Sequence, residues 1–380
     1  MLAKTITGRS PTEIQTELEQ CLADGFSPTL AIVFASVKLD RKAICEMLGA
    51  KGLDIIGATS CGEFTNGYQG EGSAVVMLLN LNRAYYSILF EDIHGRKLDE
   101  VATNLANEAL NRFKNPALIL CSSGISVEGE IFNGEGLVRS MERVIGPHVK
   151  MHGGMAGDDY ALTGSYVFTN NHSSDKGIAA LVLDEDRVSV VGMAISGWKP
   201  LGIAKTVTKS EDGWLYSIDD QPALETYLRY LGKQSISTDE FYEDVGLLYP
   251  LQVQSGDDPV MRTPMAMDRE KNALKLDFPV STGTKIQFSM PPDFDIVENV
   301  LKMATELRDN AKYDAEALLI FSCAGRLNAL GPMTKMENDG LGELWKTPMA
   351  GFFTYGEYGT TKEKQEFHST TISWLALKEK

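Results

Sequence analysis

Cysteine is scarce in this 380-residue chain and is never clustered. No Cys-x-x-Cys pair is present, so the sequence has neither the ligand spacing of a zinc site nor the density of a disulfide scaffold. The five residues are Cys21, Cys45, Cys61, Cys121 and Cys323. Most are expected to be buried as small apolar residues, although the last three stand where strands are predicted to end.

Basic residues are outnumbered, since 36 Lys and Arg stand against 52 Asp and Glu, a formal net charge of -16. Such a field repels nucleic acid and anionic lipid, so neither is expected as a partner. No run of about 18 apolar residues is present, and the N-terminal segment lacks the apolar core of a signal peptide. We therefore expect a cytoplasmic protein with no membrane insertion.

Catalytic and phosphate-binding motifs are also missing. Cys121-Ser122-Ser123-Gly124 is not a G-x-S-x-G elbow, and no histidine is placed to suggest a base partner. The glycine-rich segments have neither G-x-x-x-x-G-K-[ST] nor G-x-G-x-x-G spacing. We expect a protein that is not an enzyme, and an uncharacterised enzyme is kept as an alternative.

What the chain does contain is one short motif in three places. Residues 351–357 (GFFTYGE) are matched by residues 57–63 (GATSCGE), and residues 152–158 (HGGMAGD) form a looser copy. In each, a short apolar strand reaches a glycine and a later glycine precedes a carboxylate. Glycine tolerates positive φ, so each of these three segments, which we call corners, is expected to turn sharply and present its carboxylate at the sheet end.

Each corner closes a similar stretch of helix, strand, helix and corner strand. Predicted helices over 11–25, 98–115 and 295–313 precede apolar strands over 29–36, 117–124 and 317–326. Such a repeat predicts stacked units. Their strand ends are expected to share a rim or cleft, where ligand sites of α/β sheets commonly lie. The alternative is that glycines and small residues merely make the turns.

These patterns predict an α/β protein with an α+β tendency, in which mixed and antiparallel sheets are covered by helices. We expect two domains, residues 1–199 and 200–380, built from repeated helix-strand-helix-strand units whose corners converge. The boundary is placed where Trp-Lys-Pro-Leu-Gly, from residue 198, interrupts the pattern. A doubly wound parallel sheet is the runner-up, and it is disfavoured because several strands follow one another with no room for a crossover helix.

The polar residues of the corners are the candidate ligand-binding groups. They are Cys61, Glu63, Asp158, Asp159, Tyr355 and Glu357. Alternatively, each carboxylate caps a helix or accepts backbone N–H groups in a tight turn. Arg326 follows an apolar strand and a glycine, and two roles suit it equally: clamping a ligand carboxylate bidentately, or pairing internally with Glu357.

Two of the five histidines stand near the corners. His152 begins the second corner, and His368 lies on the strand after the third. These are the candidate metal ligands if a haem binds, although a single imidazole without a motif is more often an ordinary hydrogen-bonded residue. No cofactor is therefore certain, and haem is the candidate.

Several of these motifs resemble one known family. GATSCGEF and GGMAGDDYALTGSYVF, followed by GIAALVL, resemble the FIST N-terminal domain, while ALETYLRYLG, FSCAGR, AGFFTYGEYG and FHSTT resemble the FIST C-terminal domain. The resemblance implies a bacterial sensory module that binds a small ligand such as an amino acid. No output domain is recognised, so the expected partner is a separate histidine kinase, chemoreceptor or cyclic-di-GMP enzyme. Some stand-alone proteins similar to this one bind haem, so the resemblance also implies an alternative, a nitric-oxide sensor that regulates a histidine kinase.

Overall fold

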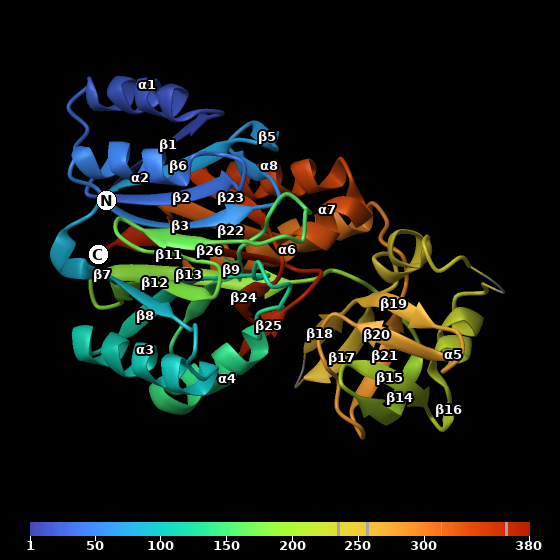
Figure 1. The fold of residues 1–380 in the computed structure, drawn as a ribbon. Helices are drawn as coiled ribbons and strands as arrows, with labels where there is room; N and C mark the ends of the chain where they lie inside the picture. The colour runs from blue at the N-terminus through green and yellow to red at the C-terminus, as the bar shows by residue number, and fades with distance from the viewer. Residues whose placement is uncertain (234–235, 256–257, 313, 362–363) are drawn as a thin grey trace.

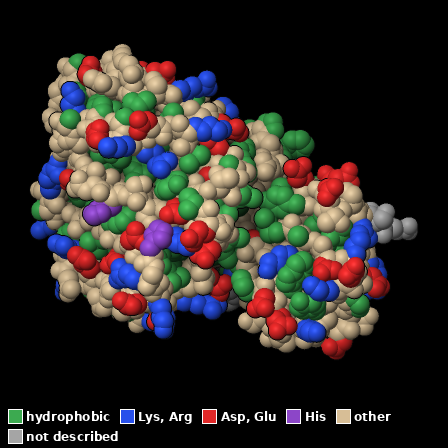
Figure 2. All heavy atoms as spheres, viewed as in Figure 1, with side chains coloured by type: hydrophobic (Ala, Val, Ile, Leu, Met, Phe, Trp, Pro, Cys, Tyr) green, Lys and Arg blue, Asp and Glu red, His purple; other side chains and the backbone are tan. Residues whose placement is uncertain are grey.

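The computed structural model describes residues 1–380 except 234–235, 256–257, 313 and 362–363 (Figure 1). A large body contains three six-stranded sheets, and a smaller β-rich lobe projects from it. The predicted mixed α/β architecture is confirmed. In the described residues no helix has the length and apolar content needed to cross a membrane. Acidic and basic side chains are interspersed over the visible face of both parts (Figure 2).

The body is made of three equivalent units. The first comprises β1 (Leu2–Gly8), α1 (Pro11–Leu22), β2 (Leu30–Ser36), α2 (Arg41–Ala50), β3 (Asp54–Ser60), β4 (Glu63–Thr65), β5 (Tyr68–Gly70) and β6 (Ala74–Asn80). The second comprises η1 (Arg83–Tyr85), β7 (Tyr86–Asp92), α3 (Leu98–Arg112), β8 (Pro116–Ser122), α4 (Gly134–Ile145), β9 (Met151–Met155), β10 (Val167–Thr169), β11 (Ser173–Ser174) and β12 (Gly177–Asp184). The third comprises β13 (Val188–Ile195), α6 (Asp295–Ala311), β22 (Ala317–Cys323), α7 (Ala324–Leu330), α8 (Met333–Trp345), β23 (Met349–Thr354), β24 (Glu357–Thr360), β25 (Gln365–His368) and β26 (Ile372–Glu379).

Strand order is the same in the three large sheets. The orders are β1-β6-β2-β3-β10-β11, β7-β12-β8-β9-β24-β25 and β13-β26-β22-β23-β4-β5. In each sheet the two central strands are parallel and joined through helices, and they have antiparallel neighbours. The predicted repeat is therefore the unit from which the body is built, and the mixed pairing excludes a doubly wound parallel sheet.

The units exchange their outer strands in a ring. The hairpin that follows the corner of the first unit begins with β4, which pairs with β23 of the third. In the same way β24 of the third unit pairs with β9 of the second, and β10 of the second pairs with β3 of the first. Each unit thus completes the sheet of another, so the three are joined by backbone hydrogen bonds.

One apolar core lies between the three sheets. Side chains from all three units meet in it, including Phe34, Phe321 and Phe352, and the rings of Phe34 and Phe352 stack at 4.4 Å. Helices cover the outer faces: α1 and α2 on the first sheet, α3 and α4 on the second, α6 and α8 on the third. Because the central strands are buried on both faces, they read in the sequence as continuous apolar runs, not as alternating patterns.

The lobe is an insertion between β13 and α6 of the third unit. It comprises β14 (Pro200–Glu211), β15 (Trp214–Ile218), β16 (Gln221–Pro222), α5 (Ala223–Tyr230), the single π-type turn η2 (Tyr242–Gly246), β17 (Leu251–Ser255), β18 (Asp258–Arg262), β19 (Pro264–Asp268), β20 (Ala273–Leu276) and β21 (Lys285–Ser289). Its strands form an eight-stranded sheet with its own apolar core.

The boundary predicted between residues 199 and 200 falls where this insertion begins. Strands on either side of this boundary nevertheless pair with each other. The pairs are β13 with β26, β4 with β23 and β9 with β24. The division into residues 1–199 and 200–380 stays a prediction about sequence units, whereas in space the third unit joins the first two.

Candidate functional site

The three corners meet at the carboxyl ends of the parallel strand pairs. Two backbone hydrogen bonds join each pair of corners: Cys61 N to Phe353 O (2.9 Å) and Phe353 N to Gly62 O (2.8 Å); Met155 N to Gly356 O (2.8 Å) and Tyr355 N to Met155 O (3.2 Å); Gly157 N to Thr59 O (2.8 Å) and Asp159 N to Ser60 O (2.9 Å). The predicted convergence is therefore confirmed, and residues from three distant parts of the chain share one end of the body.

The first glycine of each corner strand makes this approach sterically feasible. A Cβ added at Gly57, Gly153 or Gly351 would lie 2.6, 1.9 or 2.5 Å from a carbonyl oxygen of the parallel neighbour strand. Side chains at these positions would push the parallel strands apart. The repeated glycine therefore has a packing reason in addition to its effect on the turn.

The corner glutamates Glu63 and Glu357 are fully buried. Each accepts a hydrogen bond from the hydroxyl three residues earlier: Glu63 from Ser60, and Glu357 from Thr354 at 2.5 Å. Ser73 Oγ also donates to Glu63, at 2.6 Å. Burial raises the pKa of Glu63 to about 7 and raises the pKa of Glu357 well above the usual carboxyl range. Buried side chains with such local contacts stabilise the corner turns from the protein interior.

Asp158 organises the loop after the second corner. Its carboxylate accepts from the backbone N–H groups of Leu162 (3.1 Å), Thr163 (2.6 Å) and Gly164 (3.0 Å), and from the Tyr355 hydroxyl. Within this loop Asp159, Tyr160 and Leu162 have φ of 54°, 63° and 53°. Left-handed backbone costs a residue with a side chain on the order of 1–3 kcal/mol. The other two corners run directly into their hairpins, so the strained loop is specific to the second unit.

In the described part of the chain, only one of the two carboxylate oxygens of Asp159 accepts a hydrogen bond. Its Oδ2 accepts from Ser36 Oγ at 2.7 Å and lies 3.3 Å from Lys38 Nζ, while its side chain is only 6% exposed. The other carboxylate oxygen, Oδ1, is buried and has no hydrogen-bond partner among the residues that the structure describes. A buried carboxylate oxygen without a donor is costly, so it is a place where a bound group can be recognised.

Three half-buried tyrosines surround the meeting point. Tyr160 donates to Ala324 O at 3.1 Å, Tyr355 donates to Asp158, and Tyr242 comes from the lobe. Burial raises the pKa of all three phenols, and the nearby Cys61 and Cys323 contribute to the shift in Tyr160 and Tyr242. We call this group the corner site: Cys61, Asp158, Asp159, Tyr160, Tyr242, Cys323 and Tyr355.

The two thiols of the corner site are not activated. Burial raises the pKa of Cys61 to about 12 and raises the pKa of Cys323 further. A cysteine needs a lowered pKa to act as a nucleophile at neutral pH, so both behave as small buried side chains. Nothing in this arrangement resembles an activated nucleophile and its base.

Arg326 is fully buried and paired internally. Its Nε donates to Glu337 at 2.8 Å, its Nη2 donates to the second oxygen of the same carboxylate, and its Nη1 donates to Ser196 O at 2.5 Å. Trp198 lies under the guanidinium at 5.2 Å. Of the two predicted roles the structure shows internal pairing, but with Glu337 in place of Glu357, because α8 turns Glu337 toward the sheet.

Sequence reasoning missed Glu337, Tyr160 and Tyr242. The first had a signal, since Glu337 shares the face of α8 that carries Leu341 and Trp345 at spacings of four. The two tyrosines had none, because one lies in an irregular loop and the other in the inserted lobe.

The predicted haem ligands His152 and His368 are 1% and 2% exposed. They are close enough that His368 contributes, after burial and Lys150, to lowering the pKa of His152 to about 3. His152 Nδ1 has no partner in the described part of the chain, yet packed backbone lies beside the ring. A Cβ on Gly192 would be 2.9 Å from His152 Cε1 and 2.3 Å from Trp374 O. A porphyrin does not fit between these groups as they are packed.

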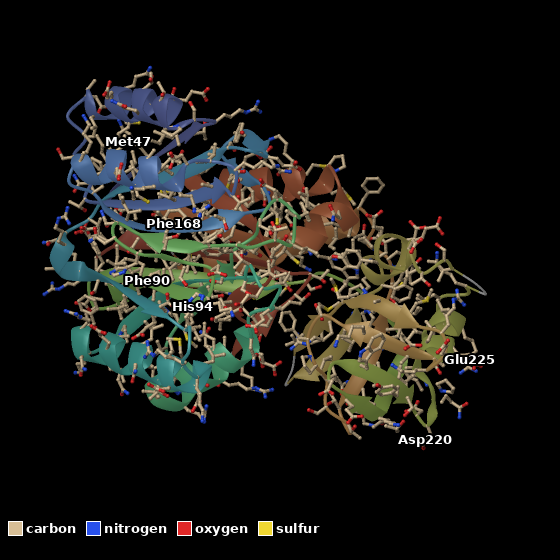
Figure 3. All side chains as sticks on the ribbon, in the orientation of Figure 1. Met47, Phe90, His94, Phe168, Asp220 and Glu225 are labelled. Atoms are coloured by element: carbon tan, nitrogen blue, oxygen red, sulfur yellow. The ribbon has the colours of Figure 1, made fainter. Side chains whose placement is uncertain are left out.

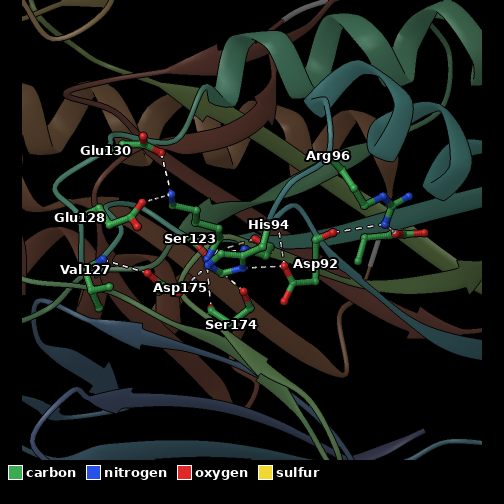
Figure 4. A network of polar contacts seen from close by, with 12 residues as sticks. Asp92, His94, Arg96, Ser123, Val127, Glu128, Glu130, Ser174 and Asp175 are labelled. Atoms are coloured by element: carbon green, nitrogen blue, oxygen red, sulfur yellow. Dashed lines mark hydrogen bonds and ion pairs between the residues drawn. The ribbon is translucent and has the colours of Figure 1, made fainter.

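Another polar cluster surrounds His94 (Figure 4). Its Nδ1 lies 2.7 Å from Asp92 and its Nε2 lies 3.4 Å from Asp175, while Lys176 bridges Glu128 and Glu130. These contacts tie the loop before α4 to the ends of β7 and β12. Within the described ranges no group of three or more His, Cys, Asp or Glu side chains is arranged to hold a metal ion.

Comparison with known families assigns most of the chain. Residues 29–221 match the FIST N domain and residues 223–360 match the FIST C domain. A comparison with curated proteins gives no match.

Proposed function

Because the chain belongs to the FIST family, whose domains are associated with sensing in signal transduction, we propose that it binds a small polar ligand at the corner site and signals to a separate protein. The family is a sensory one and is not a known enzyme family. The neutral thiols of the corner site agree with a binding role.

The observation that carries the proposal is the buried Oδ1 of Asp159, which has no hydrogen-bond partner among the described residues. It sits on a strained loop at the point where three corners meet, and it lies in the group of residues predicted to bind ligand. Strain and an unsatisfied acceptor both cost folding free energy, and both concentrate at functional sites. A ligand that donates to Asp159 recovers part of that cost.

A primary ammonium group suits this acceptor, because it brings both positive charge and donors. Amino acids and similar small amines are therefore the proposed ligand class. Asp158 and Tyr355 shape the loop that carries Asp159. Cys61 packs against Gly157, at the start of that loop. Glu63, Glu357 and Arg326 are fully buried and are assigned the role of stabilising the corners from the interior. Arg326 already donates to both oxygens of Glu337 and to Ser196 O.

The lobe provides a route for the signal. Tyr242 of the lobe belongs to the corner site, and Arg262 and Asp277 of the lobe contact Glu135 and Ser369 of the body. A ligand at the corner site therefore touches the junction between body and lobe, where binding can change their relative position. The proposed receivers are a histidine kinase, a chemoreceptor or a cyclic-di-GMP enzyme.

We test ligand binding by thermal shift and calorimetry with amino acids, simple amines and carboxylates. A ligand at about 100 times its dissociation constant should add roughly 2.7 kcal/mol of stability. Asp159→Asn keeps the shape and removes the charge, so it should abolish the shift. Asp186→Asn, at an exposed aspartate of the same body, should preserve it. A shift that survives in Asp159→Asn, or no shift with any amine, contradicts the proposal.

A haem-based nitric-oxide sensor is the other function that the family resemblance implies. It is not proposed, because His152 and His368 are both buried and backbone packs beside the His152 ring.

A further inference from the structure

A cavity of about 560 Å³ opens on the lobe beside α5. Two largely buried leucines, Leu224 and Leu228, line it together with polar groups from α5, from the segment after α5 and from the turn between β19 and β20. The other lining residues are Glu225, Arg229, Gly232, Lys233, Arg269 and Asn272. Figure 3 shows Glu225 at the end of the lobe remote from the body.

The residues that line the cavity carry a net positive charge, whereas the segment that contains them is acidic. Segment 200–290 contains 9 Lys and Arg against 14 Asp and Glu, a balance of -5. Three of those 9 cations line the cavity but only one of the 14 acids does, which leaves two positive charges in excess. An acidic chain that gathers cations around one cavity has a local field that attracts anions.

Three other basic residues of the lobe are paired with acidic side chains, whereas the cations of the cavity are not, in the part of the chain that the structure describes. Lys205, Arg262 and Lys271 form ion pairs with acidic side chains, and Lys275 and Lys285 donate hydrogen bonds to Asp212 O and Thr206. Arg229, Lys233 and Arg269, like Lys209, Lys275 and Lys285, form no ion pair within the described part of the chain; Arg269 donates to Ile236 O. Among the residues that the structure describes, no acidic side chain pairs with the three cations of the cavity.

Asn272 adds uncharged donors to the cavity wall. Its Oδ1 accepts from Glu225 N at 2.9 Å, which commits the amide oxygen and leaves the amide NH₂ as donor. Apolar side chains, cations and an amide are the groups that a site for a small amphipathic anion needs, and the volume lies within the usual range for ligand pockets.

We propose that this cavity binds a small organic dianion with a short apolar body, namely a dicarboxylate or a phosphate monoester. The two excess positive charges match a dianion, and the leucines match its carbon skeleton. The site lies on the lobe and takes a ligand of opposite charge, so it is independent of the amine proposed for the corner site.

Calorimetry on the full chain tests the inference with succinate, phenyl phosphate, inorganic phosphate and butyrate as probes. A dianion with a carbon skeleton should bind about tenfold more tightly than the monoanion butyrate. Arg229→Gln should weaken binding about fivefold, and Glu225→Gln should strengthen it by a similar factor because it removes the one opposing charge. Lys209→Gln, an exposed lysine of β14 outside the cavity, is the matched control and should change affinity less than about twofold.

The comparison between succinate and phenyl phosphate identifies which of the two sources supplies the ligand. Equal affinity for butyrate and the dianions overturns the proposal, as does equal weakening by Arg229→Gln and Lys209→Gln. Arg229→Gln should leave the amine-induced shift of the corner site unchanged. Failure at one site is therefore distinguishable from failure at the other.

Discussion

Breaking the buried pair between Arg326 and Glu337 should destabilise the protein severely. Both side chains are 0% exposed, and the guanidinium makes two bonds to the carboxylate and one to Ser196 O. Arg326→Met keeps most of the volume but leaves a buried carboxylate without its counter-charge. Removing one partner of a buried pair costs about 3–5 kcal/mol, a large part of the 5–15 kcal/mol that typically stabilises a protein.

The double variant Arg326→Met/Glu337→Met separates pairing from packing. Because it removes both charges, it should be more stable than Arg326→Met alone by about 2 kcal/mol. Lys335→Met serves as the control, since Lys335 pairs with Asp339 on the same helix at 2.6 Å but is 44% exposed. An exposed pair is worth less than about 1 kcal/mol.

Urea-induced unfolding followed by far-UV circular dichroism measures all of these variants. If Arg326→Met unfolds at nearly the same urea concentration as the parent, the pair does not hold the third corner in place. A double variant no more stable than the single one would show that the lost stability comes from packing, not from the unpaired charge.

Two further predictions concern the corners. Burial raises the pKa of Glu63 from 4.5 to about 7, so only the folded state holds this proton between those values; stability should fall by on the order of 3 kcal/mol as pH rises from 4.5 to 7. Glu63→Gln should flatten that fall in urea midpoints, and an unchanged slope would assign the pH dependence to other groups. Gly153→Ala places a Cβ 1.9 Å from Leu120 O and should cost more than about 3 kcal/mol, whereas Gly232→Ala, with φ of 67° and open space, should cost about 1 kcal/mol. Thermal unfolding that shows equal costs would contradict the close approach of β8 and β9.

Local patterns were enough to predict the corners and the units. A glycine at a strand end permits backbone conformations that other residues resist, wherever it occurs. An apolar run of seven residues predicts a buried strand in any fold. The α/β class and the meeting of the corners followed from these signals, because equivalent strands end at the same edge when equivalent units pack together.

Which side chains pair with each other over long sequence distances was decided only by the tertiary structure. Arg326 pairs with Glu337 and not with Glu357, because the connection through α7 and α8 places Glu337 beside the guanidinium. Thr354 donates to one oxygen of the Glu357 carboxylate. The pairing predicted between Arg326 and Glu357 depended on the corner motif alone. That motif carries no information on which side chains the neighbouring helix directs toward the sheet.

The exchange of hairpins between units also could not be predicted from the sequence. Each of β4, β10 and β24 is three or four residues long, and nothing in such a short segment indicates which sheet it will extend. The three units close around one core, and each hairpin extends the sheet of a neighbouring unit. Repeated local signals determined what the units are, and the closure of the ring determined which residues meet at the corner site.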